Sequence, residues 1–226
     1  MVYIRVKDAD EGGKYLGRAI LGALNKDLNV LWLVSGGSNT QIGCEVRRSL
    51  PDNRLKNLKM AQVDERFGNY GHKDSNYTQL QRAGFDFNYI DFVPVLTSEN
   101  LSFERTAQAY EQRIKILLKE SDMVIGQFGI GHDGHTAGIL PHSVGCAIDH
   151  RLVIGYQAPD FKRITLSFKA IGMIDEAYIF AFGEDKLLPL SLLRGKEQPL
   201  SDQPAQIFRQ STPKSYIINN MIGDRV

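Results

Sequence analysis

The sequence is poor in the features that would place a protein outside a reducing, aqueous compartment. Only two of its 226 residues are cysteines, Cys44 and Cys146, and their spacing matches neither a zinc ligand pair nor a redox motif. No apolar run approaches the roughly 18 residues that a membrane helix needs. Residues 1–7 lack the long apolar core of a signal peptide. We therefore expect a cytoplasmic protein with reduced cysteines and no membrane partner.

An excess of charge of one sign is also missing. The 27 basic and 26 acidic residues leave a net charge of +1. Nucleic acids and acidic membranes attract proteins through a broad basic field. We therefore expect no nucleic-acid partner, and any anion that the protein binds must be held by local groups.

Linkers, repeats and low-complexity tracts are absent as well. A chain of this length can bury the core of one α/β domain or of two small ones. With 42% hydrophobic and 23% charged residues, the composition is typical of globular proteins. We expect one domain over residues 1–226, with a small excursion around residues 140–175, and a monomer.

The apolar pattern alternates between strands and helices. Continuous apolar runs predict buried strands over residues 30–34, 58–63, 123–128 and 177–182. Amphipathic spacing predicts helices over residues 11–28, 42–50, from about 77, 102–118, 187–193 and 205–209. Shorter strands are predicted over residues 2–6, 93–96, 152–156, 163–168 and 215–218. This alternation predicts a three-layer α/β/α fold with a largely parallel, Rossmann-like sheet and helices on both faces.

The segment from Gly129 to Ala137 is the strongest functional signal. It follows a predicted strand and contains three glycines, with Asp133 between His132 and His135. Glycines permit close approach of the backbone, and the amides of such a turn can bind anions. Histidine is suited to proton transfer near neutral pH. A turn alone does not require an aspartate between two histidines, so this segment indicates a reactive site.

Three further segments carry polar groups where a predicted strand ends: Ser35-Gly36-Gly37-Ser38, Asp64-Glu65-Arg66 and Gly183–Lys186. Because ligands bind beyond the carboxyl ends of parallel strands, we expect all of these loops to converge on one edge of the sheet. The serine-glycine turn has the parts of a phosphate cradle, although it is not a Walker loop. Side chains alternate along a strand, which predicts Asp64 and Arg66 on one side and Glu65 on the other. With Arg163 and Lys186, Arg66 would give the crevice three cations.

Two cofactor-binding alternatives are less favoured. Residues 129–134 match G-x-G-x-x-G, but Asp133 would repel a pyrophosphate, and no acidic residue ends the next predicted strand near Tyr156. A metal site built from His132, His135 and His142 matches no strong zinc spacing. We therefore expect no metal and no cofactor.

Taken together, five segments resemble the 6-phosphogluconolactonase family in order and spacing over nearly the whole chain. They are Ser35-Gly36-Gly37-Ser38, Asp64-Glu65-Arg66, Asp74-Ser75-Asn76-Tyr77, Gly129–Ala137 and Arg163-Ile164-Thr165-Leu166. The related glucosamine-6-phosphate deaminases share a Gly-x-Asp-Gly-His element. There an apolar residue and an Asn-Glu-Pro triplet follow the histidine, whereas this chain has Thr136 and no such triplet. The family commonly has Glu at the position of His132 and Thr-Pro at the positions of Asn39 and Thr40.

The resemblance implies a cofactor-free lactone hydrolase of the pentose phosphate pathway, which converts 6-phosphogluconolactone to 6-phosphogluconate. It implies that His135 activates a water molecule and that Asp133 or Asp64 orients and polarises the imidazole. A small sugar phosphate is the expected partner. The residues expected to bind the substrate and its phosphate are Ser35, Gly36, Gly37, Ser38, Arg66, Gly131, Arg163 and Lys186.

Two other functions stay open. In an aldose–ketose isomerase or deaminase of an amino sugar phosphate, Asp64 would be the carbon-acid base and His135 would assist ring opening. The missing Asn-Glu-Pro triplet speaks against this alternative. In a non-catalytic sugar-phosphate sensor, His135 could be lost with little change in ligand binding, whereas an enzyme would lose its activity.

Overall fold

The chain folds around a seven-stranded sheet in which every neighbouring pair of strands is parallel. The structure is a computed structural model, and it describes residues 1–148, 150–210 and 214–223. In sheet order the strands are β1 (Val2–Arg5), β10 (Lys214–Asn219), β9 (Glu176–Ala181), β6 (Met123–Gly129), β2 (Val30–Val34), β3 (Leu58–Gln62) and β5 (Asp91–Val93).

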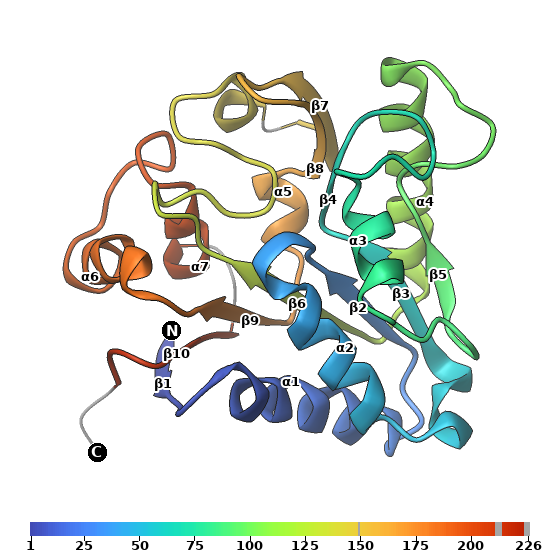
Figure 1. The fold of residues 1–226 in the computed structure, drawn as a ribbon, viewed down its shortest axis with the longest axis horizontal. Helices are drawn as coiled ribbons and strands as arrows, with labels where there is room; N and C mark the ends of the chain where they lie inside the picture. Colours follow the sequence, from blue (N-terminus) through green and yellow to red (C-terminus); the bar gives the residue numbers. More distant parts are fainter. Residues whose placement is uncertain (149, 211–213, 224–226) are drawn as a thin grey trace.

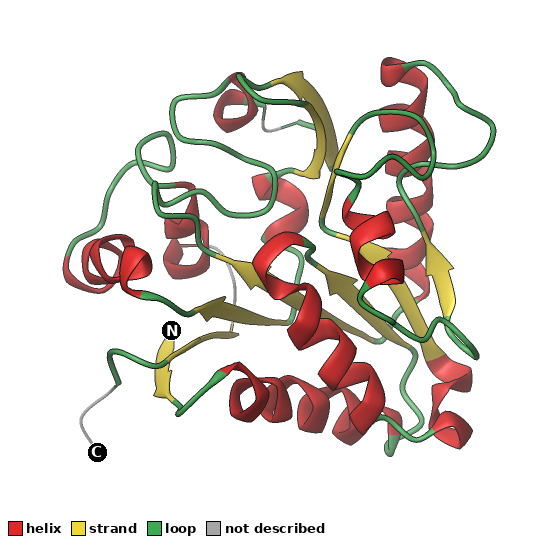
Figure 2. Cartoon of the chain, in the orientation of Figure 1, coloured by secondary structure: helices red, strands yellow, loops and turns green. Residues whose placement is uncertain are grey.

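Helices cover both faces of this sheet (Figures 1 and 2). One layer contains α1 (Ala9–Leu24), α2 (Thr40–Ser49) and α3 (Asn76–Arg82). The other contains α4 (Phe103–Glu120), α5 (Phe168–Ile171), α6 (Leu187–Gly195) and α7 (Ile207–Gln210). Successive strand residues point to opposite faces, so Trp32 packs in the first layer and Leu33 in the second. The predicted α/β/α fold with a parallel sheet is confirmed.

A second, three-stranded sheet lies above the carboxyl ends of the main sheet in Figure 1. It is antiparallel and contains β4 (Asp64–Arg66), β8 (Lys162–Leu166) and β7 (Val153–Gln157). The sequence pattern predicts Asp64-Glu65-Arg66 as the end of the preceding strand, but these residues form a strand of their own. Val63 is the crossing point, because its amide donates to Val34 O in the main sheet while its carbonyl accepts from Leu166 N, at 2.9 Å each.

Local capping explains where the elements differ from the predicted pattern. The strand predicted over residues 163–168 ends at Leu166, because the Ser167 side chain accepts from Ala170 N and begins α5. The strand predicted over residues 93–96 lies earlier, as β5. Within the described residues the remaining elements are the 3₁₀ turns η1 (Gly37–Asn39), η2 (Asp52–Asn57), η3 (Val144–Ala147), η4 (Glu184–Lys186) and η5 (Pro204–Gln206).

The sheet has a topological switch point between β2 and β6. The chain continues from β2 through α2 to β3 on one side, whereas β6 pairs with β2 on the other side. Connections that leave in opposite directions open a crevice at the carboxyl ends of the two strands. β2 ends at Val34 and β6 ends at Gly129, so the two glycine-containing loops begin next to this crevice. Gln127 Nε2 joins them by donating to Asn39 O at 3.0 Å.

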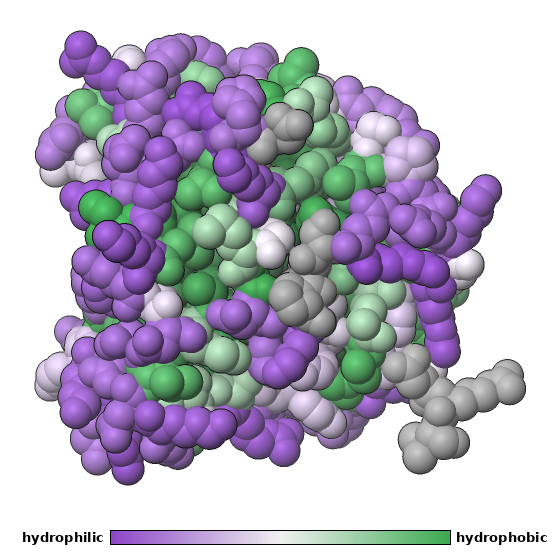
Figure 3. Space-filling model, turned by 180° about the vertical axis from the view of Figure 1, so that it is seen from behind, coloured by the Kyte–Doolittle hydropathy of each residue, from purple (hydrophilic) through white to green (hydrophobic). Residues whose placement is uncertain are grey.

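Among the helices that the structure describes, none is long and apolar enough to cross a membrane. Seen from behind, the molecule is largely covered by polar side chains around a central apolar area (Figure 3). The motifs that the sequence singles out lie near the carboxyl ends of the main sheet.

Glu65 is the buried carboxylate that connects the two sheets to α3. It has no exposed surface. It accepts hydrogen bonds from five donors: Gln62 Nε2 at 2.9 Å, Arg66 N at 2.8 Å, Ser75 Oγ at 2.9 Å, Asn76 N at 2.6 Å and Tyr77 N at 3.0 Å. Two of these donors are the first amides of α3, where a carboxylate stabilises the helix.

Replacing Glu65 by Gln should therefore destabilise the fold. The amide group of Gln would bring donors toward a site that already supplies only donors, and we expect a loss of about 2–4 kcal/mol in the free energy of unfolding. Urea denaturation measures it, and the exposed residue Glu99 supplies the matched control Glu99→Gln. Equal stabilities of the two variants would contradict the role of Glu65.

Candidate functional site

One pocket opens where the carboxyl ends of β2 and β6 meet the small sheet. It is lined by Ser35, Gly36, Gly37, Ser38, Asn39, Asp64, Arg66, Asn76, Gly129, Ile130, Gly131, His132, His135, Ala137, Arg163 and Lys186. The four segments expected to converge therefore do so. Every residue that the sequence analysis assigns to the site lines this pocket except Asp133, which contacts the His135 ring.

His135 and Asp133 form the closest acid–imidazole pair of the site. His135 Nδ1 lies 2.6 Å from Asp133 Oδ1, and the His135 amide donates to the same oxygen at 3.1 Å. Burial alone would raise the pKa of Asp133, but the hydrogen bonds and charge of His135 outweigh it and lower that pKa. In the tautomer that carries its proton on Nδ1, the ring donates a hydrogen bond to the carboxylate, and the lone pair of Nε2 stays free.

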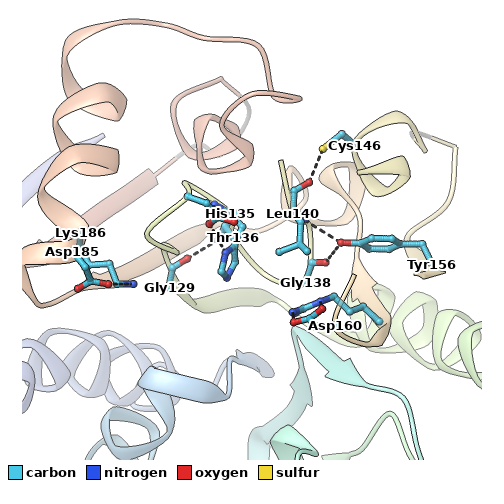
Figure 4. Close-up of polar contacts among 12 residues, drawn as sticks. Gly129, His135, Thr136, Gly138, Leu140, Cys146, Tyr156, Asp160, Asp185 and Lys186 are labelled. Atoms are coloured by element: carbon cyan, nitrogen blue, oxygen red, sulfur yellow. Dashed lines mark hydrogen bonds and ion pairs between the residues drawn. The ribbon is translucent and has the colours of Figure 1, made fainter. Parts of the chain in front are cut away.

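The turn that holds this pair is shaped by glycine. Gly131 N donates to His135 O at 2.8 Å, and Gly134 N donates to Gly131 O at 3.0 Å, with Gly134 at φ +84°. Thr136 Oγ1 closes the loop by donating to Gly129 O at 2.9 Å (Figure 4). A Cβ atom on Gly131 would overlap the His135 ring and lie 2.5 Å from Asp133 Oδ1. Only glycine at this position leaves enough space for the His135–Asp133 pair.

Tyr156, on β7 of the small sheet, fixes the chain that follows His135. Its hydroxyl donates to Gly138 O at 2.6 Å and accepts from Leu140 N at 3.1 Å (Figure 4). Thr165 Oγ1, on β8, accepts from Gly138 N at 2.9 Å. The same small sheet thus carries Asp64 and positions the loop of His135. No motif in the sequence indicates this role for Tyr156.

Asp64 lies on β4, opposite Thr165 of β8, and is 7% exposed. Burial raises the pKa of its carboxyl group, although the charges of Arg163 and Arg66 act in the opposite direction. Asn76 Nδ2 donates to the Asp64 carbonyl at 2.9 Å and reaches Asp64 Oδ2 at 3.3 Å. Asp64 and Arg66 line the pocket while Glu65 points away from it, as strand alternation predicts.

The three predicted cations come from different elements: Arg66 from β4, Arg163 from β8 and Lys186 from η4. Arg163 Nη2 lies 2.6 Å from Asp160 Oδ2, and Lys186 Nζ lies 2.8 Å from Asp185 Oδ2. Figure 4 shows Asp185 beside Lys186. The two aspartates are half exposed, at 48% and 58% of their side-chain surface. They hold the two cations in place from the solvent side.

The Arg66 guanidinium is placed by neutral groups. Its Nη1 donates to Asp74 O at 3.2 Å, and its central carbon lies 5.4 Å from the centre of the Phe161 ring. Arg66 Nε is buried without a hydrogen-bond partner among the described residues. Of the three cations, Arg66 is therefore the one whose charge is not shared with a carboxylate in a described ion pair.

The Ser35–Ser38 turn leads through η1 into α2. Gly37 adopts φ +61°, and Gly36 packs so closely on Asn76 that a Cβ atom there would lie 2.5 Å from Asn76 Cγ. Within the described chain, neither η1 nor α2 begins with a side-chain cap. The first amides of this helical segment are therefore available to an anion in the pocket.

Six lining residues are not among the site residues predicted from the sequence: Asn39, Asn76, Gly129, Ile130, His132 and Ala137. Asn39 directly follows the glycine turn at Ser35–Ser38, and Asn76 lies within Asp74–Tyr77. The polar amide of each side chain, so near a glycine turn or a quoted motif, is the signal that could have indicated it. The sequence places His132 in the reactive segment and in the metal alternative, but predicts no role for it in substrate binding. In the described residues, no group of three or more His, Cys, Asp or Glu side chains could hold a metal ion.

Comparison with known proteins agrees with this architecture. A sequence model of the family described as glucosamine-6-phosphate isomerases/6-phosphogluconolactonase matches residues 7–217. The 6-phosphogluconolactonase of Neisseria meningitidis is 26% identical over 215 residues, which cover 89% of this chain and 85% of that protein. The 6-phosphogluconolactonase of Synechocystis is 22% identical over 204 residues, which cover 85% of this chain and 83% of that protein.

Solved structures show the same fold. The 6-phosphogluconolactonase of Leishmania guyanensis superposes with a TM-score of 0.81 at 21% identity, over 96% of this chain and 95% of that one. The fold and its polar pocket define the class, an α/β enzyme with its site at the switch point of a parallel sheet. The chain belongs to the glucosamine-6-phosphate isomerase/6-phosphogluconolactonase family.

Replacing Gly131 by Ala should separate His135 from Asp133, because the new methyl group occupies the space of the imidazole. We expect the side-chain ¹⁵N NMR signals of His135 to change while the fold persists. Gly22→Ala is the matched control, since a Cβ at Gly22 of α1 meets no atom within 4 Å. Unchanged His135 signals in Gly131→Ala would contradict the packing described here.

The lowered pKa of Asp133 has a direct test by ¹³C NMR titration. We expect its carboxyl group to titrate below the usual value of about 3.9, and to return toward that value in His135→Asn. Because the folded pKa is the lower one, the stability that Asp133 contributes is present above about pH 3.9 and is lost as the pH falls through the folded pKa. The same midpoint in both proteins would contradict the pairing.

Proposed function

We propose that the protein hydrolyses 6-phosphogluconolactone to 6-phosphogluconate, with His135 as the general base. The observation that carries this proposal is the arrangement of one pocket, in which an oriented imidazole faces the same space as three cations and an uncapped helical turn. A phosphorylated ester of small size needs both parts, a seat for the dianion and a base beside the carbonyl. The named relatives support the choice of substrate.

The phosphate group would be held by Ser35–Ser38 with Arg66, Arg163 and Lys186. Amides at the start of a helical segment bind anions, and one guanidinium group can bind two phosphate oxygens at once. Two negative charges on the substrate account for three cations in a chain whose net charge is only +1. Gly131 lines the pocket without a side chain, so its backbone would lie close to the ligand.

The reaction would proceed by attack of water on the lactone carbonyl. Nε2 of His135 accepts a proton from the water as its oxygen bonds to the carbonyl carbon, and Asp133 stabilises the imidazolium that forms. The carbonyl oxygen becomes anionic and accepts hydrogen bonds from loop amides that line the pocket. The ring C–O bond then breaks, and the imidazolium returns its proton to the departing ring oxygen. Asp64, on the small sheet, lines the same pocket, and in its ionised form it would attract the imidazolium that forms during the reaction.

The test is lactone consumption at slightly acidic pH, where the spontaneous reaction is slow. A positioned base contributes about 10²–10⁴-fold, so His135→Asn should lower kcat/KM by that factor while the variant still binds 6-phosphogluconate. His142→Asn is the matched control. His142 is 73% exposed, lies outside the pocket and has φ +55°, which Asn tolerates.

The remaining outcomes separate the alternatives. Turnover that is unchanged in His135→Asn would contradict the assigned base. A wild-type rate equal to the background, together with binding of 6-phosphogluconate, would indicate the sugar-phosphate sensor. Ammonia release from glucosamine-6-phosphate would instead indicate the deaminase, with Asp64 as the base.

A further inference from the structure

Asn39 is a pocket residue for which the proposed reaction has no use so far. It is the last residue of η1, and it is 4% exposed. Its backbone is fixed on both sides, because its amide donates to Gly36 O at 3.2 Å and its carbonyl accepts from Gln127 Nε2 at 3.0 Å. The backbone that carries this side chain is therefore held in place where the residue lines the pocket.

The carboxamide of Asn39 has no hydrogen-bond partner among the described residues. It caps neither η1 nor α2. It packs against the end of β6, where a Cβ atom on Gly129 would lie 2.6 Å from Asn39 Nδ2. Unlike Asn76 Oδ1, which is sealed from solvent, the amide atoms of Asn39 remain open to the pocket that the residue lines. A buried amide that has no protein partner and faces a cavity is available to a ligand.

We propose that the Asn39 carboxamide donates a hydrogen bond to the phosphate group of the substrate and so selects phosphorylated over unphosphorylated lactones. This inference rests on the proposed function. Asn39 ends the same 3₁₀ turn whose first amides are available to an anion, and it lines the same pocket, which places its side chain beside the expected phosphate seat. Phosphate oxygens only accept hydrogen bonds, and the amide NH₂ offers two donors without adding charge.

Asn39→Asp tests the assignment with almost no change in shape. Asp replaces the donor by a negative charge, and we expect 6-phosphogluconate to bind about 10- to 100-fold more weakly by calorimetry. KM for 6-phosphogluconolactone should rise by a similar factor, with kcat within about twofold. Inorganic phosphate should inhibit the variant less than the wild type.

Thermal stability provides an independent check, because Asn39→Asp should weaken ligand binding without destabilising the fold. Asp is a good first residue for α2, so Tm without ligand should be unchanged or higher in Asn39→Asp. The rise in Tm caused by 6-phosphogluconate should shrink. Asn25→Asp, at the exposed end of α1, adds the same charge far from the pocket and should leave binding and turnover unchanged. Asn39→Thr keeps a donor and should recover part of the affinity.

The proposed function and the inference about Asn39 can be tested separately, because the first concerns turnover and the second concerns binding. If the wild type does not hydrolyse the lactone but binds 6-phosphogluconate in an Asn39-dependent way, the proposed function is wrong and this inference stands. If Asn39→Asp binds 6-phosphogluconate and phosphate as tightly as the wild type, the inference is overturned. A fall in kcat with unchanged KM would also overturn it, because Asn39 would then contact the reacting carbonyl group.

Discussion

The chain leaves β2 and β6 in opposite directions along the sheet, and the whole site depends on this switch point. Parallel strands place their carboxyl ends at one edge, and the switch point keeps helices from closing over that edge. The crevice is then finished by a structure that is not part of the main sheet. The small antiparallel sheet brings Asp64, Arg66 and Arg163 from the side, and its Tyr156 fixes the loop that carries His135. Two sheets with different strand directions therefore build one pocket.

Charge is concentrated in this pocket although the chain as a whole is nearly neutral. Arg163 and Lys186 are each paired with a half-exposed aspartate, so their long side chains are ordered before any ligand arrives. Preordered groups lose less entropy on binding than free ones. The same aspartates weaken the attraction for an anion, whereas Arg66 is oriented by a carbonyl and an aromatic ring and forms no described ion pair. Arg163 and Lys186 are thus ordered by ion pairs, whereas Arg66 has a charge that no described ion pair offsets.

Much of this arrangement could be predicted from the sequence. Apolar runs and glycine turns mark the strands of the main sheet and their functional ends, and alternation alone separates Glu65 from Asp64 and Arg66. The rest depends on contacts between distant segments, which no local pattern reveals. Nothing near Val63 indicates that the chain changes sheets there, because the change is set by partners at Val34 and Leu166. Tyr156 and Asn39 likewise gain their roles from neighbours that only the folded chain supplies.

The position of β1 in the sheet has a consequence for the order in which the protein folds. β1 is the first strand of the chain, yet its neighbour in the main sheet is β10, the last one. Its backbone groups can therefore be paired within the sheet only once β10 is available. Such contacts between distant parts of a chain form slowly, since a long loop must close first. During synthesis on the ribosome, this edge of the sheet would be completed last, after the strands at the switch point are already in place.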